Sequence, residues 1–179
     1  MIPVFLANGF EEIEALAVVD ILRRADVDVV TVGVGSKMPV GAHGIAVCAD
    51  IGEDELNINE MTGVVLPGGM PGTTNLEASA VVQTAVAYAA ERNLLLAAIC
   101  AAPSILGHGG YLCGKMATCY PGFETELGDA TVCRRGVVTD GNIITASGAG
   151  VAVEFALELV RYLISADASD AIRGGIQCP

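Results

Sequence analysis

The sequence predicts an α/β fold, with a mostly parallel sheet and helices on both of its faces. Short apolar segments without polar interruption, typical of strands buried on both faces, alternate with longer stretches of helical periodicity. The chain has 179 residues, of which 53% are hydrophobic and 17% charged, so we expect a single domain, residues 1–179, with a large core. In such folds ligands bind beyond the carboxyl ends of the strands.

The first half of the chain is expected to contain three strands, an extended segment and a helix. Residues 2–8 (IPVFLAN) predict the first strand, and residues 9–26 place apolar side chains at helical spacing before two arginines in the last turn. A second strand at 27–35 leads through a turn-rich segment to an extended segment at 42–50. The next buried strand, 63–69, ends in two glycines.

The second half repeats this alternation. In chain order, the expected elements are a helix at 79–93, a strand at 94–100, a helix from about 102 toward 107, a short strand at 115–121, a short helix at 122–129, a hairpin at 137–147 and a long amphipathic helix at 148–165. The hairpin is predicted from the dipeptide Asp140-Gly141, which is a strong turn signal. The tail, 173–179, is expected to be loose or packed on a partner.

Composition argues against several classes of function. A net charge of −12 and a pI near 4.3 disfavour nucleic-acid binding through a basic patch. The N-terminal segment lacks the basic start of a signal peptide, and no uncharged apolar run reaches the length of a membrane span. We therefore expect a cytoplasmic protein that binds neither nucleic acid nor membranes.

The chain has six cysteines, and without an export signal we expect reduced thiols. No two of them have C-x-x-C spacing. A zinc site is conceivable from four residues, but their spacing matches no common ligand pattern: His108, Cys113, Cys119 and Cys133. We expect no metal.

Cys100 stands where a predicted strand becomes a predicted helix. Such a turn is typical of a nucleophile elbow, which exposes its reactive residue in strained geometry and needs small neighbours such as Ala101. Pro103 suits the first turn of the following helix, whose N-terminus is expected to acidify the thiol. The alternative interpretation is an inert, buried cysteine.

Glu14 shares the apolar stripe of the first helix with Val18 and Ile21. A carboxylate buried there loses hydration unless it is protonated or paired, so we expect a carboxyl with a raised pKa that shares a proton with a nearby thiolate. The alternative is a solvated glutamate in the first helical turn.

The segment LPGGMPGTTN follows another strand. Its glycines allow close backbone approach, and the N–H groups of Gly69 and Ala101 could together bind an oxyanion. A phosphate-binding loop is the competing idea, but the Gly-Lys-Ser/Thr sequence it requires is absent, and the GVG at 33–35 lacks the third glycine of the dinucleotide pattern. We expect no cofactor.

Five motifs together carry a resemblance to a known family: GFEEIEA, VVLPGGMPG, AAICAAP, ATCYPGFE and SGAGVAVEFAL. In this order they resemble the ThiJ/PfpI superfamily, within it the branch of the Parkinson-disease-associated protein and bacterial YajL. The resemblance extends from Ile2 to about Leu163. It implies a flavodoxin-like three-layer sandwich and a homodimer, with Cys48 at the dimer interface.

The resemblance also implies roles for individual residues. Cys100 corresponds to the family's oxidation-sensitive nucleophile, Glu14 to the buried glutamate bonded to it, and Gly69 and Ala101 to backbone donors of oxyanion type. Four more residues are expected to line the site or contact substrate: Gly68, Tyr120, Arg24 and His43.

Two departures from the family pattern bear on the chemistry. Many relatives carry a histidine before the proline of the T-x-P segment, whereas here Tyr120 precedes Pro121. His108 is expected to be structural, so efficient proton transfer at the thiol is in question. Peptidase-like branches follow their nucleophile with elements suited to a Cys-His pair, and Ala101 in that position disfavours proteolysis.

The sequence therefore supports a cofactor-independent cysteine enzyme, of glyoxalase III or deglycase type. Its expected substrates are small 2-oxoaldehydes, methylglyoxal or glyoxal, and glycated proteins, with Cys100 forming a hemithioacetal and Glu14 moving protons. The alternative is a non-catalytic oxidative-stress sensor or chaperone dimer that forms a Cys100 sulfinate. A role in thiamine-precursor biosynthesis has no phosphate-binding motif to support it.

Overall fold

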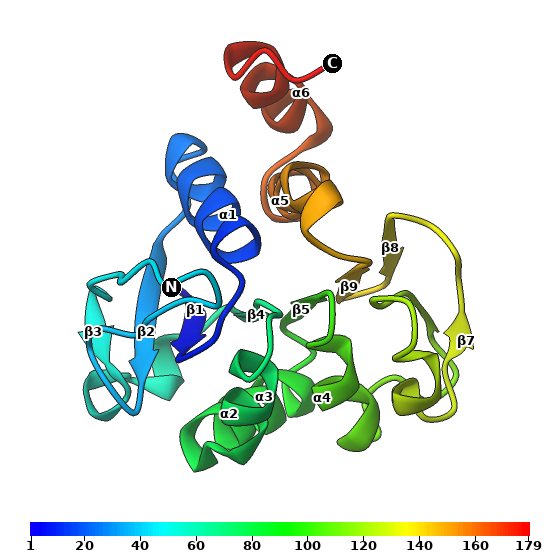
Figure 1. Ribbon diagram of the computed structural model, residues 1–179. Coiled ribbons are helices and arrows are strands. Elements are labelled where there is room, and N and C mark those ends of the chain that lie inside the picture. The colour runs from blue at the N-terminus through cyan, green and yellow to red at the C-terminus, as the bar shows by residue number, and fades with distance from the viewer.

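The computed structural model describes residues 1–179 and has a seven-stranded sheet at its centre (Figure 1). The strand order is β3-β2-β1-β4-β5-β9-β8, and every neighbouring pair is parallel except β8 and β9. The strands are β1 (Ile2–Ala7), β2 (Val29–Val34), β3 (Ile51–Gly52), β4 (Gly63–Leu66), β5 (Leu95–Ile99), β8 (Val137–Asp140) and β9 (Ile143–Ala146). A separate two-stranded sheet pairs β6 (Met116–Ala117) with β7 (Thr131–Val132). The predicted α/β fold is confirmed.

Helices cover both faces of the sheet, which gives three layers (Figure 1). One face carries α1 (Glu12–Arg24) and α5 (Ala152–Leu163), with α6 (Ala166–Gly175) packed on α5. The other carries α2 (Gly72–Ala78), α3 (Ala80–Glu91) and α4 (Pro103–His108). Short 3₁₀ helices lie in the connections: η1 (Glu53–Glu55), η2 (Ile58–Glu60), η3 (Glu124–Leu127) and η4 (Ala149–Val151). None of the helices is both long and apolar enough to cross a membrane.

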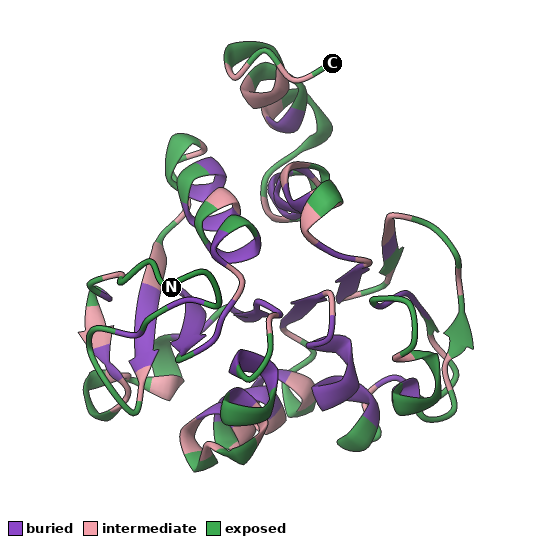
Figure 2. Ribbon diagram, in the orientation of Figure 1, coloured by how far each residue is buried: buried purple, intermediate pink, exposed green.

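The core lies on both sides of the sheet, as Figure 2 shows by the burial of the strands. Successive residues of β1 point to opposite faces: Val4 and Leu6 pack toward α1 and α5, whereas Phe5 packs toward the other helical layer. Each side holds a cluster of 21 buried apolar residues. Because the two clusters are equal, the strands must be apolar on both faces, which explains their uninterrupted hydrophobic sequences.

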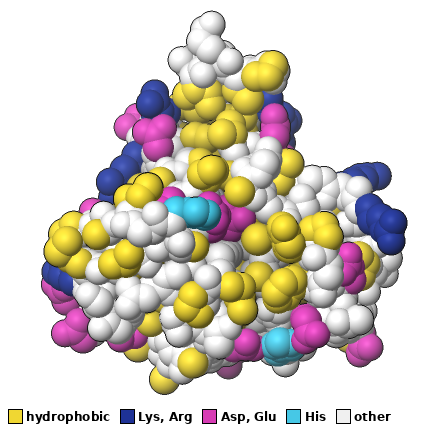
Figure 3. All heavy atoms as spheres, in the orientation of Figure 1, with side chains coloured by type: hydrophobic (Ala, Val, Ile, Leu, Met, Phe, Trp, Pro, Cys, Tyr) yellow, Lys and Arg dark blue, Asp and Glu magenta, His cyan; other side chains and the backbone are white.

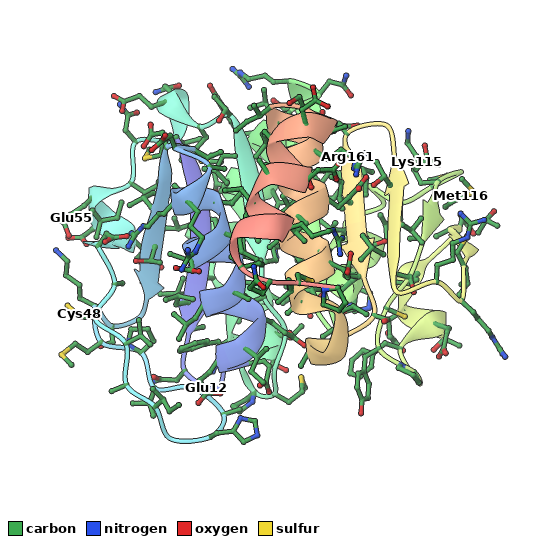
Figure 4. All side chains as sticks on the ribbon, turned by 90° about the horizontal axis from the view of Figure 1, so that it is seen from above. Glu12, Cys48, Glu55, Lys115, Met116 and Arg161 are labelled. Atoms are coloured by element: carbon green, nitrogen blue, oxygen red, sulfur yellow. The ribbon has the colours of Figure 1, made fainter.

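The direction of winding reverses between β1 and β4 and creates the crevice where doubly wound folds bind ligands. From β1 the chain moves outward to β2 and β3, and from β4 it moves the opposite way to β5. The carboxyl ends of β1, β4 and β5 therefore meet at one edge. Figure 4 places Glu12, at the start of α1, at one end of the molecule and Arg161, near the end of α5, toward the other.

Several element predictions need correction. The expected extended segment at 42–50 has only an isolated bridge between Val40 and Ala46, and the edge strand is β3, just beyond it. Helix α2 is absent from the prediction because its sequence, GTTNLEA, is short and mostly polar. The hairpin at 137–147 is confirmed as β8 and β9.

The first residues of the C-terminal tail, 173–179, are helical rather than loose, because α6 continues to Gly175. The Ser165 hydroxyl accepts a hydrogen bond from the Ala168 N–H at 3.1 Å and begins this helix. The Ser169 hydroxyl donates to the Leu157 carbonyl at 2.8 Å and binds α6 to α5. Ala168, Ile172 and Ile176 recur at helical spacing and pack against the core, so an apolar stripe positions α6 together with these contacts.

Candidate active site

Cys100 follows β5 directly and forms the expected turn from strand to helix. Its φ is +65°, a left-handed conformation that costs a non-glycine residue about 1 kcal/mol or more. Two backbone hydrogen bonds hold it: its N–H donates to the Ala146 carbonyl, and its carbonyl accepts from the Tyr120 N–H, both at 2.8 Å. Neighbouring strands and loops therefore maintain the strained backbone at the thiol.

Glu14 lies in the first turn of α1 and is 1% exposed, which excludes the solvated alternative. Its Oε2 accepts the Gly68 N–H at 2.9 Å. The carboxyl group also interacts with the Cys100 thiol, although Oε1 has no well-aligned hydrogen-bond partner. One oxygen is thus held by the backbone, and the carboxyl remains available to the sulfur.

Gly68 lies between these two side chains. Because it has no side chain of its own, Cys100 and Glu14 can approach each other. A Cβ at this position would lie 2.6 Å from both the Cys100 Cβ and Glu14 Oε2. Such distances are shorter than van der Waals contact, so any side chain would push the thiol and the carboxyl apart. Glycine is required at this position for steric reasons, since its φ is not positive.

The backbone N–H groups of Gly69 and Ala101 lie near the Cys100 thiol and favour its ionised form. Gly69 has φ +90°, and a Cβ there would lie 2.4 Å from the Glu11 nitrogen. The loop is fixed to the start of α1 by a hydrogen bond from the Glu11 N–H to the Gly68 carbonyl at 2.9 Å. Two backbone donors thus lie beside the sulfur to which a substrate would bond.

Burial controls the electrostatics of the pair. It raises the pKa of Glu14 to about 7, against the opposing effects of hydrogen bonds from Cys100 and Gly68. Burial, together with the adjacent Glu14 carboxylate, raises the pKa of the Cys100 thiol to about 12, although the Gly69 and Ala101 N–H groups lower it. The expected acidification by the helix N-terminus is therefore outweighed, and that part of the prediction is wrong.

The two pKa values belong to one coupled pair. A protonated Glu14 removes the negative charge that opposes thiolate formation and can donate its proton to the sulfur. An ionised Glu14 can instead accept the thiol proton. The pair can hold and move one proton near neutral pH without a histidine.

Arg24 is the expected site residue that the chain does not bring to Cys100. It ends α1, ten residues beyond Glu14 and about 15 Å further along the helix axis. Its guanidinium is exposed and pairs with Asp20 at 2.7 Å.

His43 lies beside the start of α1 and contacts Glu12. Its Nδ1 is 3.0 Å from Glu12 Oε2, and its backbone N–H donates to Glu12 Oε1 at 2.8 Å. Glu12 is 5% exposed, and its pKa is lowered by these hydrogen bonds despite its burial. No local signal in the sequence shows that Glu12 binds a loop 31 residues away.

Tyr120 directly precedes Pro121 in the loop that follows β6. It is half exposed, and its ring lies over Gly148, where a Cβ would be 3.3 Å from the ring. His108, at the end of α4, is bonded to Glu77 and Glu126, as a structural role predicts. Figure 3 shows both histidines on one face, each beside acidic side chains. Both imidazoles are therefore held by carboxylates rather than by the thiol.

All six cysteines are free thiols. The four residues considered for zinc do not gather, since the one group of three or more candidate ligands is formed by Glu11, Glu12 and His43. Cys48 is exposed at the edge of the molecule (Figure 4).

Comparison with known proteins agrees with this architecture. The sequence model described as the DJ-1/PfpI family matches residues 1–162. The chain is 35% identical to the Parkinson disease protein 7 homolog of Danio rerio, over 95% of this chain and 93% of the relative. It is 31% identical to Deglycase PfpI of Pyrococcus furiosus, over 88% and 95%. It spans only 36% and 44% of the length of two Arabidopsis thaliana relatives, Protein DJ-1 homolog B and homolog A.

Among solved structures, oxidized DJ-1 of Toxoplasma gondii superimposes with a TM-score of 0.94 at 31% identity. The superposition covers 98% of this chain and 97% of that one. The predicted three-layer, flavodoxin-like arrangement is thereby confirmed.

Proposed function

The chain belongs to the DJ-1/PfpI family, and on this premise we propose that it is a cofactor-independent cysteine enzyme that converts 2-oxoaldehydes to hydroxy acids. The observation that carries the proposal is the buried Glu14 carboxyl beside the Cys100 thiol, with two backbone N–H groups near the same sulfur. A relative that bears the name deglycase supports chemistry on such carbonyl compounds.

The first step joins the thiol to the aldehyde. The Cys100 sulfur attacks the aldehyde carbon of methylglyoxal, and the carbonyl oxygen takes up the electron pair between the Gly69 and Ala101 N–H groups. Glu14 accepts the thiol proton and returns it to the oxygen. The product is a hemithioacetal, with every atom of both reactants retained.

The second step is an internal oxidation and reduction. The Glu14 carboxylate removes the hydrogen of the hemithioacetal carbon as a proton, which gives an enediol, and returns a proton to the neighbouring carbon. One carbon is oxidised to a thioester while its neighbour is reduced to an alcohol. Water then hydrolyses the thioester to lactate and frees the thiol. A carboxyl with a pKa of about 7 suits both directions of transfer at neutral pH.

Repair of glycated proteins would begin from a hemithioacetal or aminocarbinol adduct. The adduct would first release the protein thiol or amine with its proton, and the aldehyde carbon set free would then react with Cys100 as in the first step. We also propose a homodimer. Exposed apolar side chains lie on α1 and on the loop that Glu12 holds against it: Ile13, Leu16, Val40 and Ile45. Burying them between two copies would remove apolar surface from water. The cytoplasmic location stays a prediction.

Replacing the thiol tests the enzymatic proposal directly. Cys100→Ala should abolish lactate production from methylglyoxal, whereas Cys113→Ala, at an exposed thiol, should retain it. Full activity in Cys100→Ala would contradict the proposal.

A second function is favoured by the lack of a histidine at the thiol, because both imidazoles are held by carboxylates elsewhere. The protein would act as an oxidative-stress sensor or chaperone dimer, with a Cys100 sulfinate held by protonated Glu14 and the backbone N–H groups. Mass spectrometry after mild peroxide treatment should then find two added oxygens on Cys100 alone. Equal oxidation of all six thiols would exclude this function.

A further inference from the structure

Two adjacent arginines differ from every other basic side chain in this protein. The chain has nine lysines and arginines and 21 acidic residues, so we expect most basic side chains to have a carboxylate partner. Seven of the nine lie within 4 Å of a carboxylate: Arg23, Arg24, Lys37, Arg92, Lys115, Arg161 and Arg173. The other two, Arg134 and Arg135, form no ion pair within that distance. On the face shown in Figure 3, basic side chains lie at the margins.

Both arginines line one cavity of about 440 Å³. Cys119, Pro121 and Ser147 form part of the same wall. The cavity therefore lies between the small β6–β7 sheet and the end of β9, and it opens to solvent on the side of the two exposed arginines.

The cavity adjoins the candidate active site through the backbone. Tyr120, between Cys119 and Pro121 in the chain, donates its N–H to the Cys100 carbonyl. Ala146, which precedes Ser147, accepts the Cys100 N–H. Residues in the wall of the cavity are thus direct chain neighbours of Tyr120 and Ala146, the two residues whose hydrogen bonds hold the Cys100 backbone.

The charge in this cavity is available to a ligand. Glu124 is the only acidic residue in its lining. Its carboxylate accepts the Gly122 N–H at 2.7 Å, and backbone N–H groups and the nearby Arg134 lower its pKa, although no ion pair forms within 4 Å. The serine and threonine in the lining add hydroxyl groups. Guanidinium groups bind carboxylates and phosphates through paired, parallel hydrogen bonds, and two neighbouring arginines favour a doubly charged group further.

We propose that Arg134 and Arg135 form a subsite for the anionic group, a carboxylate or a phosphate, of a molecule whose carbonyl carbon reacts at Cys100. The inference rests on the proposed function in one respect, which is that Cys100 is the reacting group. It adds a substrate class: 2-oxoaldehydes or their adducts that carry a negative charge, in preference to neutral methylglyoxal.

Alkylation of Cys100 tests the subsite without any turnover. In this reaction the sulfur displaces iodide from iodoacetate, which is anionic, or from iodoacetamide, which is neutral and of similar size. Local positive charge should raise the rate with iodoacetate, so the variant R134Q/R135Q should lower the iodoacetate-to-iodoacetamide rate ratio at Cys100 by about fivefold at low salt. The matched control R92Q/R161Q removes the same charge from paired arginines and should leave the ratio unchanged. A ratio equal in R134Q/R135Q and wild type would overturn the proposal.

Protection by anions identifies the group that binds. Inorganic phosphate or malonate should slow the reaction of Cys100 with iodoacetamide in the wild type and in R92Q/R161Q, but not in R134Q/R135Q. Stronger protection by phosphate assigns a phosphate group, and stronger protection by malonate assigns a carboxylate. Protection by neither anion, or equal protection in all three proteins, would contradict the subsite. Because neither readout needs lactate formation, failure of the proposed enzymatic function can be distinguished from failure of the subsite.

Discussion

The Glu14 carboxyl and the Cys100 thiol meet across Gly68, at a position with no room for a side chain. A Cβ on Gly68 would lie 2.6 Å from Glu14 Oε2 and equally close to the Cys100 Cβ. The strained φ of +65° at Cys100 and the near-complete burial of Glu14 place both groups at the carboxyl edge of the sheet. The chemistry proposed for this protein depends on their contact.

The first prediction concerns that glycine. Gly68→Ala should reduce the rate of Cys100 alkylation and lower the free energy of unfolding by about 1–3 kcal/mol, because the added methyl group overpacks a rigid site. Urea unfolding and alkylation rates measure the two effects. Gly150→Ala is the matched control, since a Cβ there meets nothing within 4 Å, and it should change neither quantity. A Gly68→Ala protein as stable and reactive as wild type would show that the site tolerates separation of the pair.

The raised pKa of Glu14 predicts how stability depends on pH. The carboxyl has an ordinary pKa of 4.5 when unfolded and about 7 when folded, so between these values the folded state binds more protons. The free energy of unfolding should therefore fall as pH rises from about 4.5 to 7, by at most about 3 kcal/mol from this group. Glu14→Gln removes this contribution. Urea unfolding at pH 5 and pH 8 should show a smaller loss of stability in Glu14→Gln than in wild type, and equal losses would contradict the burial argument.

His108 should titrate above its ordinary pKa, because its hydrogen bonds to the carboxylates of Glu77 and then Glu126 favour its protonated form. Its contribution to stability is present below pH 6.5 and is lost as pH rises through the raised pKa of the folded state. The three side chains are partly exposed, so the contribution should be about 1 kcal/mol or less. Proton NMR can follow both histidines of the chain, with His43→Asn to assign them. A His108 pKa at or below 6.5, or one unchanged in Glu126→Gln, would disprove the ion-pair account.

The architecture could largely be predicted from the sequence because each strand is buried on both faces and is therefore apolar without interruption. The turn at Cys100 was also predictable, since small residues and a proline adjoin the thiol. Helix α2 was not predictable, because its segment is short and mostly polar. Helix α6 was missed although Ala168, Ile172 and Ile176 recur at helical spacing, and a tertiary contact of Ser169 also holds it. Local sequence patterns do not show which tertiary contacts will hold a short helix in place.

The electrostatics of the site were only half predictable. The apolar stripe of α1 correctly predicted the burial and raised pKa of Glu14. The same burial raises the pKa of the Cys100 thiol, and it outweighs the helix N-terminus that sequence reasoning considered alone. The pairing of Glu12 with His43 and the free pair Arg134 and Arg135 depend on which loops meet in space.

The most direct test of the central claim is the rate of lactate formation from methylglyoxal by wild type and Glu14→Gln, with adduct formation on Cys100 followed by mass spectrometry. The account predicts that Glu14→Gln still forms the hemithioacetal, because the thiol and the backbone donors remain, but more slowly, because water must replace Glu14 in the first proton transfer. Lactate formation should fall at least about 100-fold, since the group that moves the proton between carbons is missing. Lactate formation at the wild-type rate in Glu14→Gln would contradict the assignment of proton transfer to Glu14.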